Sequence, residues 1–352
     1  MTRNVLTIGI VDTHIRIRDI KQALAFNDDP EIKIVFFATR PRRENLRMFK
    51  NLNNTTYYHM RNYRVLRDAC KSEGIDLIHY HRHKPMLSKY HPRGIPRVLE
   101  VHDTGYANTR KREEKIEMKA LNMADGIICV SPAMLEYIDN RHPRIKVKNK
   151  AIVVYSYPSH KMLPKPNAEM PENFYRCIYQ GGIVNSFNKD SKYNHRYYYP
   201  YFEALCKNGI NIDVYPSHRN VFDFEKYVCI SGLEMKQSVS ALELYNIIRD
   251  YDFGFIGYNR RCNAPVMDMA MPNKLFEYIA CGIPVMTMNY SSLAKFVTDT
   301  GTGIVVDDDM SLPARFDSKM VQAKMRCLEI GRNYVMEKQT DKIKKFYRRI
   351  IS

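Results

Sequence analysis

The chain has 352 residues, of which 45% are hydrophobic and 26% are charged, as is typical of a globular protein long enough for two domains. No apolar run approaches the roughly 20 residues that span a bilayer. The first apolar run, residues 5–11, ends at Asp12 without a cleavage site, so we expect a first core strand there rather than a signal peptide. We therefore expect a cytoplasmic protein.

The chain is strongly basic. Its 55 Lys and Arg residues outnumber 38 Asp and Glu residues, for a net charge of +17. This surplus favours polyanionic partners and leaves nucleic acid, anionic membrane surfaces and phosphorylated substrates open. The eight cysteines are scattered without a C-x-x-C pair, so we expect free thiols rather than a zinc site or a disulfide framework.

In the first half of the chain, short β-rich runs alternate with segments of helical periodicity. The predicted strands are 4–11, 32–38, 76–80, 97–102, 126–131 and 151–155, and the predicted helices are 17–26, 63–72, 113–123 and 132–140. This alternation predicts a parallel sheet covered on both faces, with ligands bound at the carboxyl ends of its strands. Those ends carry His79, His81, His83, His102 and Asp103.

Residues 159–173 contain three prolines and no periodicity, so we predict an interdomain linker there. A second alternation follows, with strands predicted at 175–180, 211–215, 253–258, 283–288 and 303–306 and helices between them. The tail, 318–351, is helical and basic. The sequence thus predicts an α/β protein with domains at 1–160 and 161–332, followed by a C-terminal helix at 333–352.

Residues 271–285 read M-P-N-K-L-F-E-Y-I-A-C-G-I-P-V, a helix that begins near Pro272 and stops at Gly282. Lys274 and Glu277 share one face of this helix. A helix N-terminus with an ammonium beside it attracts phosphate, and a carboxylate one turn further on can accept hydrogen bonds from a ribose diol. The alternative is an ordinary surface ion pair.

This stretch resembles the donor-site motif of GT-B glycosyltransferases, particularly the retaining, family-4-like enzymes that build surface polysaccharides. The run A-D-G-I-I-C-V-S at 124–131 and V-H-D at 101–103 resemble segments of the same family. The resemblance implies the GT-B fold: two facing Rossmann-like parallel-sheet domains, with the last helix crossing back onto the N-terminal domain. One position departs from the family, because Met269 stands where a second Glu is usual, with Asp268 beside it.

The resemblance also implies roles for individual residues. Lys274 would contact the donor phosphate and Glu277 the nucleotide ribose, with Asn273 beside them. Gly181 and Gly182 follow a predicted strand, where glycines let the backbone approach a ligand closely.

Family members place basic residues on the diphosphate from the next loop, where Lys192 and Arg196 are alternatives to our choice, Lys189. His102 and Asp103 fall in the segment that approaches the transferred sugar, and we assign them with Lys274 to the catalytic site.

A metal site is the obvious alternative for the alternating His79, His81 and His83. No acidic or cysteine partner accompanies them at a recognisable spacing, and GT-B enzymes need no metal for the donor. We therefore expect polar residues of an acceptor cleft, no metal and no cofactor, with a nucleoside diphosphate sugar, in particular a UDP-sugar, as the donor.

The resemblance implies a hexosyltransferase-like, metal-independent enzyme that moves a sugar onto a hydroxyl of a glycan or lipid-linked acceptor with retention. Four of its five basic clusters, 40–43, 61–67, 110–112 and 141–150 but not 342–349, lie in the N-terminal half, which favours peripheral contact with the inner face of the membrane.

Three alternatives remain. A GT-B sugar-nucleotide epimerase would need an acid–base carboxylate pair, for which Asp103 and Asp268 are the candidates. A nucleic-acid-binding protein would use the charge, although no known module surrounds the aromatic runs, so we expect no nucleic-acid partner. A catalytically silent GT-B subunit would account for Met269.

Overall fold

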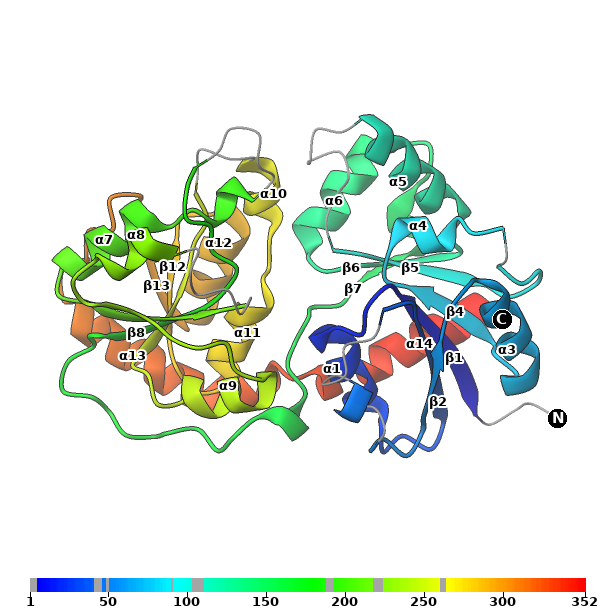
Figure 1. Cartoon of the computed structure of the whole chain (residues 1–352), viewed down its shortest axis with the longest axis horizontal. Helices are drawn as coiled ribbons and strands as arrows, with labels where there is room; N and C mark the ends of the chain where they lie inside the picture. The colour runs from blue at the N-terminus through cyan, green and yellow to red at the C-terminus, as the bar shows by residue number, and fades with distance from the viewer. Residues whose placement is uncertain are drawn as a thin grey trace. The chain divides into compact units, whose positions relative to one another are not determined.

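The computed structural model describes residues 5–40, 46–48, 51–89, 91–102, 111–187, 193–217, 224–259 and 264–352. The chain divides into two compact units (Figure 1). The N-terminal unit comprises residues 1–161 and 336–352, and the C-terminal unit comprises residues 162–335. The last segment, predicted as a separate helix from 333, is therefore part of the N-terminal unit.

The N-terminal unit is built on a seven-stranded parallel sheet of order β3-β2-β1-β4-β5-β6-β7. Its strands are β1 (Leu6–Asp12), β2 (Ile32–Ala38), β3 (Thr55–His59), β4 (Leu77–Tyr80), β5 (Arg97–Val101), β6 (Gly126–Cys129) and β7 (Ala151–Val153). Its α-helices are α1 (Ile17–Phe26), α3 (Arg64–Glu73), α4 (His83–Met86), α5 (Lys111–Met123), α6 (Pro132–Arg141) and α14 (Thr340–Ile351). The strand order reverses between β1 and β4, which makes the carboxyl ends of these strands the expected ligand position.

Burial explains which strands the sequence predicts. Every residue of β1, β4 and β6 is buried, which accounts for the predominantly apolar sequences of these strands. Strand β3 was not predicted, because this edge strand, T-T-Y-Y-H, is only half-buried and carries no apolar run.

Helix α14 packs on the N-terminal unit, which confirms the predicted return of the last helix. Gly126 of β6 makes room for it, since a Cβ there would lie 2.8 Å from the ring of Phe346. Lys344 of α14 forms ion pairs with Asp29 at 2.7 Å and Glu31 at 3.3 Å. The helix begins at Thr340 and follows a short 3-10 turn, Met336–Gln339.

The C-terminal unit repeats this topology on a six-stranded parallel sheet of order β10-β9-β8-β11-β12-β13. Its strands are β8 (Arg176–Gly181), β9 (Asn211–Pro216), β10 (Leu233–Met235), β11 (Phe253–Ile256), β12 (Val285–Met288) and β13 (Gly303–Val306). Its α-helices are α7 (Tyr199–Lys207), α8 (Glu225–Val228), α9 (Ala241–Ile248), α10 (Ala264–Met269), α11 (Asn273–Ala280), α12 (Ser291–Thr300) and α13 (Phe316–Ile330). Here the order reverses between β8 and β11. The three-residue edge strand β10 was also not predicted.

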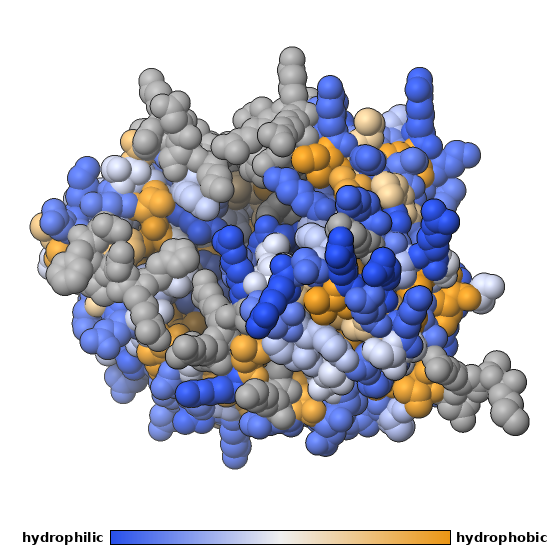
Figure 2. All heavy atoms as spheres, turned by 45° about the vertical axis from the view of Figure 1, so that its right-hand side comes forward, coloured by the Kyte–Doolittle hydropathy of each residue, from blue (hydrophilic) through white to orange (hydrophobic). Residues whose placement is uncertain are grey.

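The surface is mainly hydrophilic on the face shown in Figure 2, where hydrophobic residues form small separate areas. Among the described residues, none of the helices combines the length and the apolar character needed to cross a membrane. Several residues of the basic clusters are engaged within the fold: Lys150 donates to the carbonyl oxygens of Leu121 and Ala124, and Arg141 pairs with Glu114. The cysteines that the structure describes are free thiols.

Candidate functional site

Helix α11 carries the predicted donor residues in the C-terminal unit. Pro272 has an extended backbone and caps the helix, and Asn273 is its first residue. Leu275, Phe276 and Ile279 are fully buried and fix α11 in the unit. The opposite face of its first turns lies against the carboxyl end of β8, where Lys274 contacts Tyr179 and Glu277 contacts Gln180.

Lys274 lies beside the glycine pair at that strand end. Its Nζ is 3.8 Å from the centre of the Tyr179 ring, a cation–π contact. Gly181 has a φ of +133°, and a Cβ there would lie 3.2 Å from Lys274 Nζ. Burial lowers the pKa of Lys274 to about 7, with Arg196 adding to the effect and Glu277 opposing it. The ammonium form is therefore only weakly favoured at neutral pH. A bound anion would favour the ammonium and raise the pKa of Lys274 again.

Arg196 is the second cation at this strand end. Its guanidinium lies against Gly182, where any side chain would collide with it. The loop is fixed by two hydrogen bonds, from Val184 N to Arg196 O at 3.0 Å and from the Tyr179 hydroxyl to Gly182 O at 3.0 Å. Within the described residues, neither Arg196 nor Lys274 forms an ion pair with a carboxylate. Our sequence choice for this role, Lys189, lies outside the described residues.

Glu277 is buried, with 7% of its surface exposed, and both carboxylate oxygens accept hydrogen bonds. Oε2 accepts from Gln180 Nε2 at 2.6 Å, and Oε1 accepts from the Tyr245 hydroxyl at 3.0 Å. Gln180 lies in β8 and Tyr245 on α9, so two further elements orient the carboxylate. A carboxylate oxygen carries two lone pairs, so a carboxylate held in this way is a suitable hydrogen-bond acceptor for the hydroxyls of a diol. A simple surface ion pair with Lys274 does not describe this geometry.

Asp268, the residue beside Met269, has a structural contact. Its Oδ1 accepts from the backbone N of Ser291 at 3.2 Å and from its hydroxyl at 3.3 Å, at the start of α12. Met269 itself is buried. The carboxylate next to the missing family Glu is thus engaged at a helix N-terminus.

His102 follows β5 in the N-terminal unit, close to the point where the strand order reverses. Its Nε2 lies 3.0 Å from Oε1 of Glu100. The other oxygen of that carboxylate, Oε2, lies 3.1 Å from Nε2 of His79 and 3.3 Å from Nε2 of His81. Three imidazoles therefore converge on one carboxylate. Asp103, predicted beside His102, lies outside the described residues.

The Nδ1 atoms of His79 and His81 also have contacts within the fold. Nδ1 of His81 lies 2.5 Å from Asp19 of α1, and Nδ1 of His79 lies 2.8 Å from the hydroxyl of Tyr347 of α14. These two partners, a carboxylate and a phenolic hydroxyl, come from other elements, so the histidine pattern alone did not reveal them. Further along the same edge, Asp12 at the end of β1 pairs with Arg16 and Arg82.

Charges within this cluster set the protonation of its members. Burial opposes the imidazolium form of His81, but Glu100 and Asp19 raise its pKa to about 9. Burial and the nearby Arg18 lower the pKa of His102 to about 4. Burial also opposes ionisation of Glu100, but His102 and His81 hold the pKa of Glu100 well below its ordinary value. These pKa shifts favour the charged forms of His81 and Glu100 and the neutral form of His102 at neutral pH.

Two overlapping groups in this cluster have ligand atoms close enough together for a metal ion, within 4.8 Å of one another. They are His79, His81 and Glu100, and Asp12, Asp19 and His81. The third histidine of the sequence pattern, His83, begins α4 and belongs to neither group. The absence of a metal stays a prediction.

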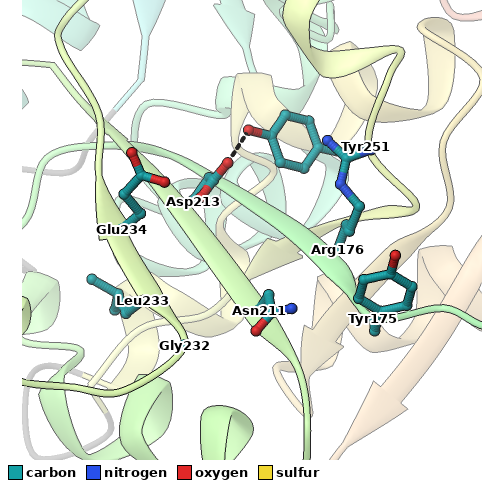
Figure 3. Close-up of a pocket in the computed structure, with 8 residues that line it drawn as sticks. All are labelled: Tyr175, Arg176, Asn211, Asp213, Gly232, Leu233, Glu234 and Tyr251. Atoms are coloured by element: carbon teal, nitrogen blue, oxygen red, sulfur yellow. Dashed lines mark hydrogen bonds between the residues drawn. The ribbon is translucent and has the colours of Figure 1, made fainter.

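A separate pocket of about 600 Å³ lies at the opposite, amino end of the C-terminal sheet (Figure 3). It is lined by Tyr175, Arg176, Asn211, Asp213, Gly232, Leu233, Glu234 and Tyr251. None of the predicted donor residues is among them, and parallel sheets of this type bind ligands at the carboxyl ends of their strands. We therefore place the candidate site at Gly181–Gly182 and α11.

Sequence reasoning missed several residues of that site. Tyr179, Gln180 and Tyr245 are engaged through contacts across the fold, with Gln180 and Glu277 97 positions apart. The one available signal was the position of Gln180 directly before the glycine pair.

Comparisons with known proteins agree with this architecture. The sequence model of Glycosyltransferase Family 4 matches residues 22–155, and that of the Glucosyltransferase 3-like, C-terminal domain matches residues 210–326. An uncharacterized glycosyltransferase of Methanocaldococcus jannaschii is 24% identical over 325 residues, which cover 85% of this chain and 81% of the relative.

Two solved structures illustrate the fold. Sucrose-phosphate synthase from Thermosynechococcus elongatus superposes with a TM-score of 0.66 at 14% identity and covers 98% of this chain and 99% of its own. HepE from Anabaena, in complex with UDP and glucose, superposes with a TM-score of 0.70 at 8% identity. The match covers 97% of this chain and 99% of the HepE chain.

The doubled parallel-sheet topology, the returning helix α14 and these matches define the chain as a GT-B glycosyltransferase. Within that class, it combines an N-terminal region like that of Glycosyltransferase Family 4 with a C-terminal region like that of the Glucosyltransferase 3 group.

Proposed function

We propose that the protein transfers a hexose from a nucleoside diphosphate sugar, in particular a UDP-sugar, to a hydroxyl of a surface glycan or lipid-linked acceptor. The observation that carries the proposal is the pairing of two cations, Lys274 and Arg196, at the Gly181–Gly182 loop with the buried carboxylate of Glu277 nearby. The cations match a diphosphate, and the carboxylate matches a ribose diol.

The chemistry follows from where charge develops. Cleavage of the bond between sugar and diphosphate leaves negative charge on the leaving phosphate, and fixed cations there lower the barrier. Lys274, Arg196 and the first N–H groups of α11, from Asn273 onward, would supply that stabilisation. Because two protein cations are available, we propose that the donor is used without a metal ion.

For the acceptor side, we propose that His102 and Asp103 contact the transferring sugar and that the sugar keeps its anomeric configuration. Both assignments rest on the resemblance of V-H-D to the family segment. Lys189 remains a proposed third contact to the diphosphate. The net charge of +17 supports an anionic, membrane-associated acceptor approached from the cytoplasmic side. The complex of Anabaena HepE with UDP supports uracil as the donor base.

The test is calorimetric titration of UDP, GDP and CDP, each with and without Mg²⁺, into the wild type and Glu277→Ala. We expect one nucleotide, UDP, to bind equally well with and without Mg²⁺, and Glu277→Ala to weaken it about tenfold or more through the lost charged hydrogen bonds. Glu329→Ala is the matched control, because Glu329 is an exposed carboxylate of the same unit that pairs with Arg326. It should bind like the wild type.

Other outcomes would contradict the proposal. Binding that requires Mg²⁺ would overturn the metal-free donor site. Tight, salt-sensitive binding of RNA without nucleotide binding would favour a nucleic-acid-binding protein instead. Interconversion of a UDP-sugar with its epimer would favour an epimerase, although the engagement of Asp268 by Ser291 argues against a free acid–base pair.

A further inference from the structure

Glu100 occupies an unusual position in the N-terminal unit, because its two oxygens contact three histidines. Oε2 faces His79 and His81, while among the described residues Oε1 forms its ion-pair contact with His102, at 3.0 Å. The His79–His81 pair is itself anchored from behind by Tyr347 and Asp19. Oε2 of Glu100 is therefore held by the anchored His79–His81 pair, and Oε1 contacts His102.

The orientation of His102 follows from its burial. Its Nε2 is buried, whereas 14% of the side chain is exposed, so the exposed surface belongs to side-chain atoms other than Nε2. A neutral imidazole donates from one nitrogen and accepts at the other. A carboxylate facing Nε2 favours the proton on that atom and leaves Nδ1 as the acceptor.

We propose that Glu100 is a positioning residue for His102, holding it in one ring orientation with its proton on Nε2 so that Nδ1 faces the transferring sugar. This proposal rests on the proposed function for the contact between His102 and the sugar. His81, as a cation between Glu100 and Asp19, keeps Glu100 ionised in a buried setting where an isolated carboxylate would be costly.

The contacts are close but not linear. Nε2 of each of the three histidines lies within 3.3 Å of Glu100, yet none is aligned with it as a hydrogen bond. Catalytic hydrogen bonds in unliganded sites are often misaligned and tighten when substrate binds. We therefore expect donor and acceptor binding to sharpen the contact between Glu100 and His102 rather than create it.

The test that does not depend on activity is the tautomer of His102, read from two-bond ¹H–¹⁵N NMR correlations and assigned with His102→Gln. We expect a single Nε2-protonated tautomer in the wild type between pH 6 and 8 and a mixture in Glu100→Gln, which keeps the side-chain volume. Glu73→Gln is the matched control, because Glu73 is a partly buried carboxylate of the same unit that pairs with Lys33 and Tyr58. It should leave His102 unchanged.

Kinetics then show whether the position matters. A misplacement of about 1 Å can cost roughly 100-fold in rate, so we expect Glu100→Gln to lower kcat about 10- to 100-fold while the donor KM stays within about threefold. A purely structural Glu100 would lower thermal stability but leave the tautomer and the kcat-to-KM split of the remaining folded enzyme unchanged, and that result would overturn the proposal.

Two further results separate the possibilities. One equivalent of zinc in the purified protein, lost in Glu100→Gln, would overturn the proposal by making Glu100 a metal ligand. A wild type that transfers no sugar but shows the Glu100-dependent tautomer would contradict the proposed function and leave the positioning of His102 supported.

Discussion

The two units share one strand topology but differ in how charge is arranged at the carboxyl ends of their strands. In the N-terminal unit, Glu100 and Asp19 are matched by His79, His81 and His102 inside the fold. In the C-terminal unit, Lys274 and Arg196 have no carboxylate partner among the described residues. The charges at this sheet edge are thus paired within the fold in the N-terminal unit, whereas two cations lack a carboxylate partner among the described residues of the C-terminal unit. This difference supports our proposal that the anionic donor binds to the C-terminal unit.

The strongest test of this contrast is removal of the positive charge at α11. Lys274→Met keeps an unbranched apolar stem but removes the ammonium beside the leaving diphosphate. Loss of one such stabilising group costs about 100- to 1000-fold in kcat, and we expect a loss in this range in a coupled assay for released UDP. Lys295→Met, an exposed lysine of α12, should retain full activity. Equal activity of both variants would remove Lys274 from the site.

The glycine at the strand end offers a second test. Gly181→Ala forces a side chain into a positive-φ position and against Lys274 Nζ, so we expect about tenfold weaker UDP binding, or about 1.4 kcal/mol. Gly209→Ala is the control, because Gly209 also has a positive φ, +84°, but no atom within 4 Å of the added Cβ. Both variants should lose about 1 kcal/mol of stability, and only Gly181→Ala should lose nucleotide affinity. Equal effects on affinity would mean that backbone strain alone is responsible.

The pH dependence of donor binding provides a third test. In the free protein the pKa of Lys274 is lowered to about 7, and a bound diphosphate raises it by favouring the ammonium. As pH rises through 7 the free protein loses the charge that the complex needs, so affinity should fall about three- to tenfold between pH 6.5 and 8.5. A UDP-sugar is the suitable ligand, because its diphosphate diester has no monoester pKa near 6. Lys274→Arg should flatten the profile, and a profile that stays unchanged would contradict the assignment.

The smallest expected effect on nucleotide binding concerns the histidine–carboxylate cluster of the N-terminal unit. Tyr347→Phe removes the hydroxyl that contacts His79 Nδ1 and leaves a buried nitrogen unpaired, which should cost about 1–2 kcal/mol of stability in urea unfolding. Nucleotide affinity should not change, because the substitution lies in the other unit. Tyr175→Phe, at an exposed tyrosine, should change neither quantity. A drop in UDP affinity with Tyr347→Phe would break the division of roles between the two units.

The fold was predictable because most strands are continuous apolar runs between helices. The edge strands β3 and β10 escaped, since a strand that is half exposed or three residues long carries no such run. The bounds of α1 and β13 agree with the prediction to the residue, whereas the predicted strand at 283–288 begins at Val285, after Pro284.

Within the candidate site, the sequence pointed to those residues that are neighbours along the chain. Lys274 and Glu277 stand three apart on one helix and were found from the motif. Arg196 was one of several cations in a loop without periodicity, and nothing in the sequence ranked it above Lys189. Glu100 and Asp19 were missed as partners of His81, because they come from a different strand and a helix and meet it only through the strand order.

The return of α14 to the N-terminal unit has a consequence for synthesis of the protein. The C-terminal unit is one continuous segment, so all its residues have left the ribosome while the N-terminal unit still lacks the helix that covers Gly126 and supplies Tyr347. Nascent chains usually fold from the N-terminal domain onward. Here the domain translated first is completed last, and until residues 340–351 emerge, His79 and the apolar surface beside β6 are open to solvent and to chaperones.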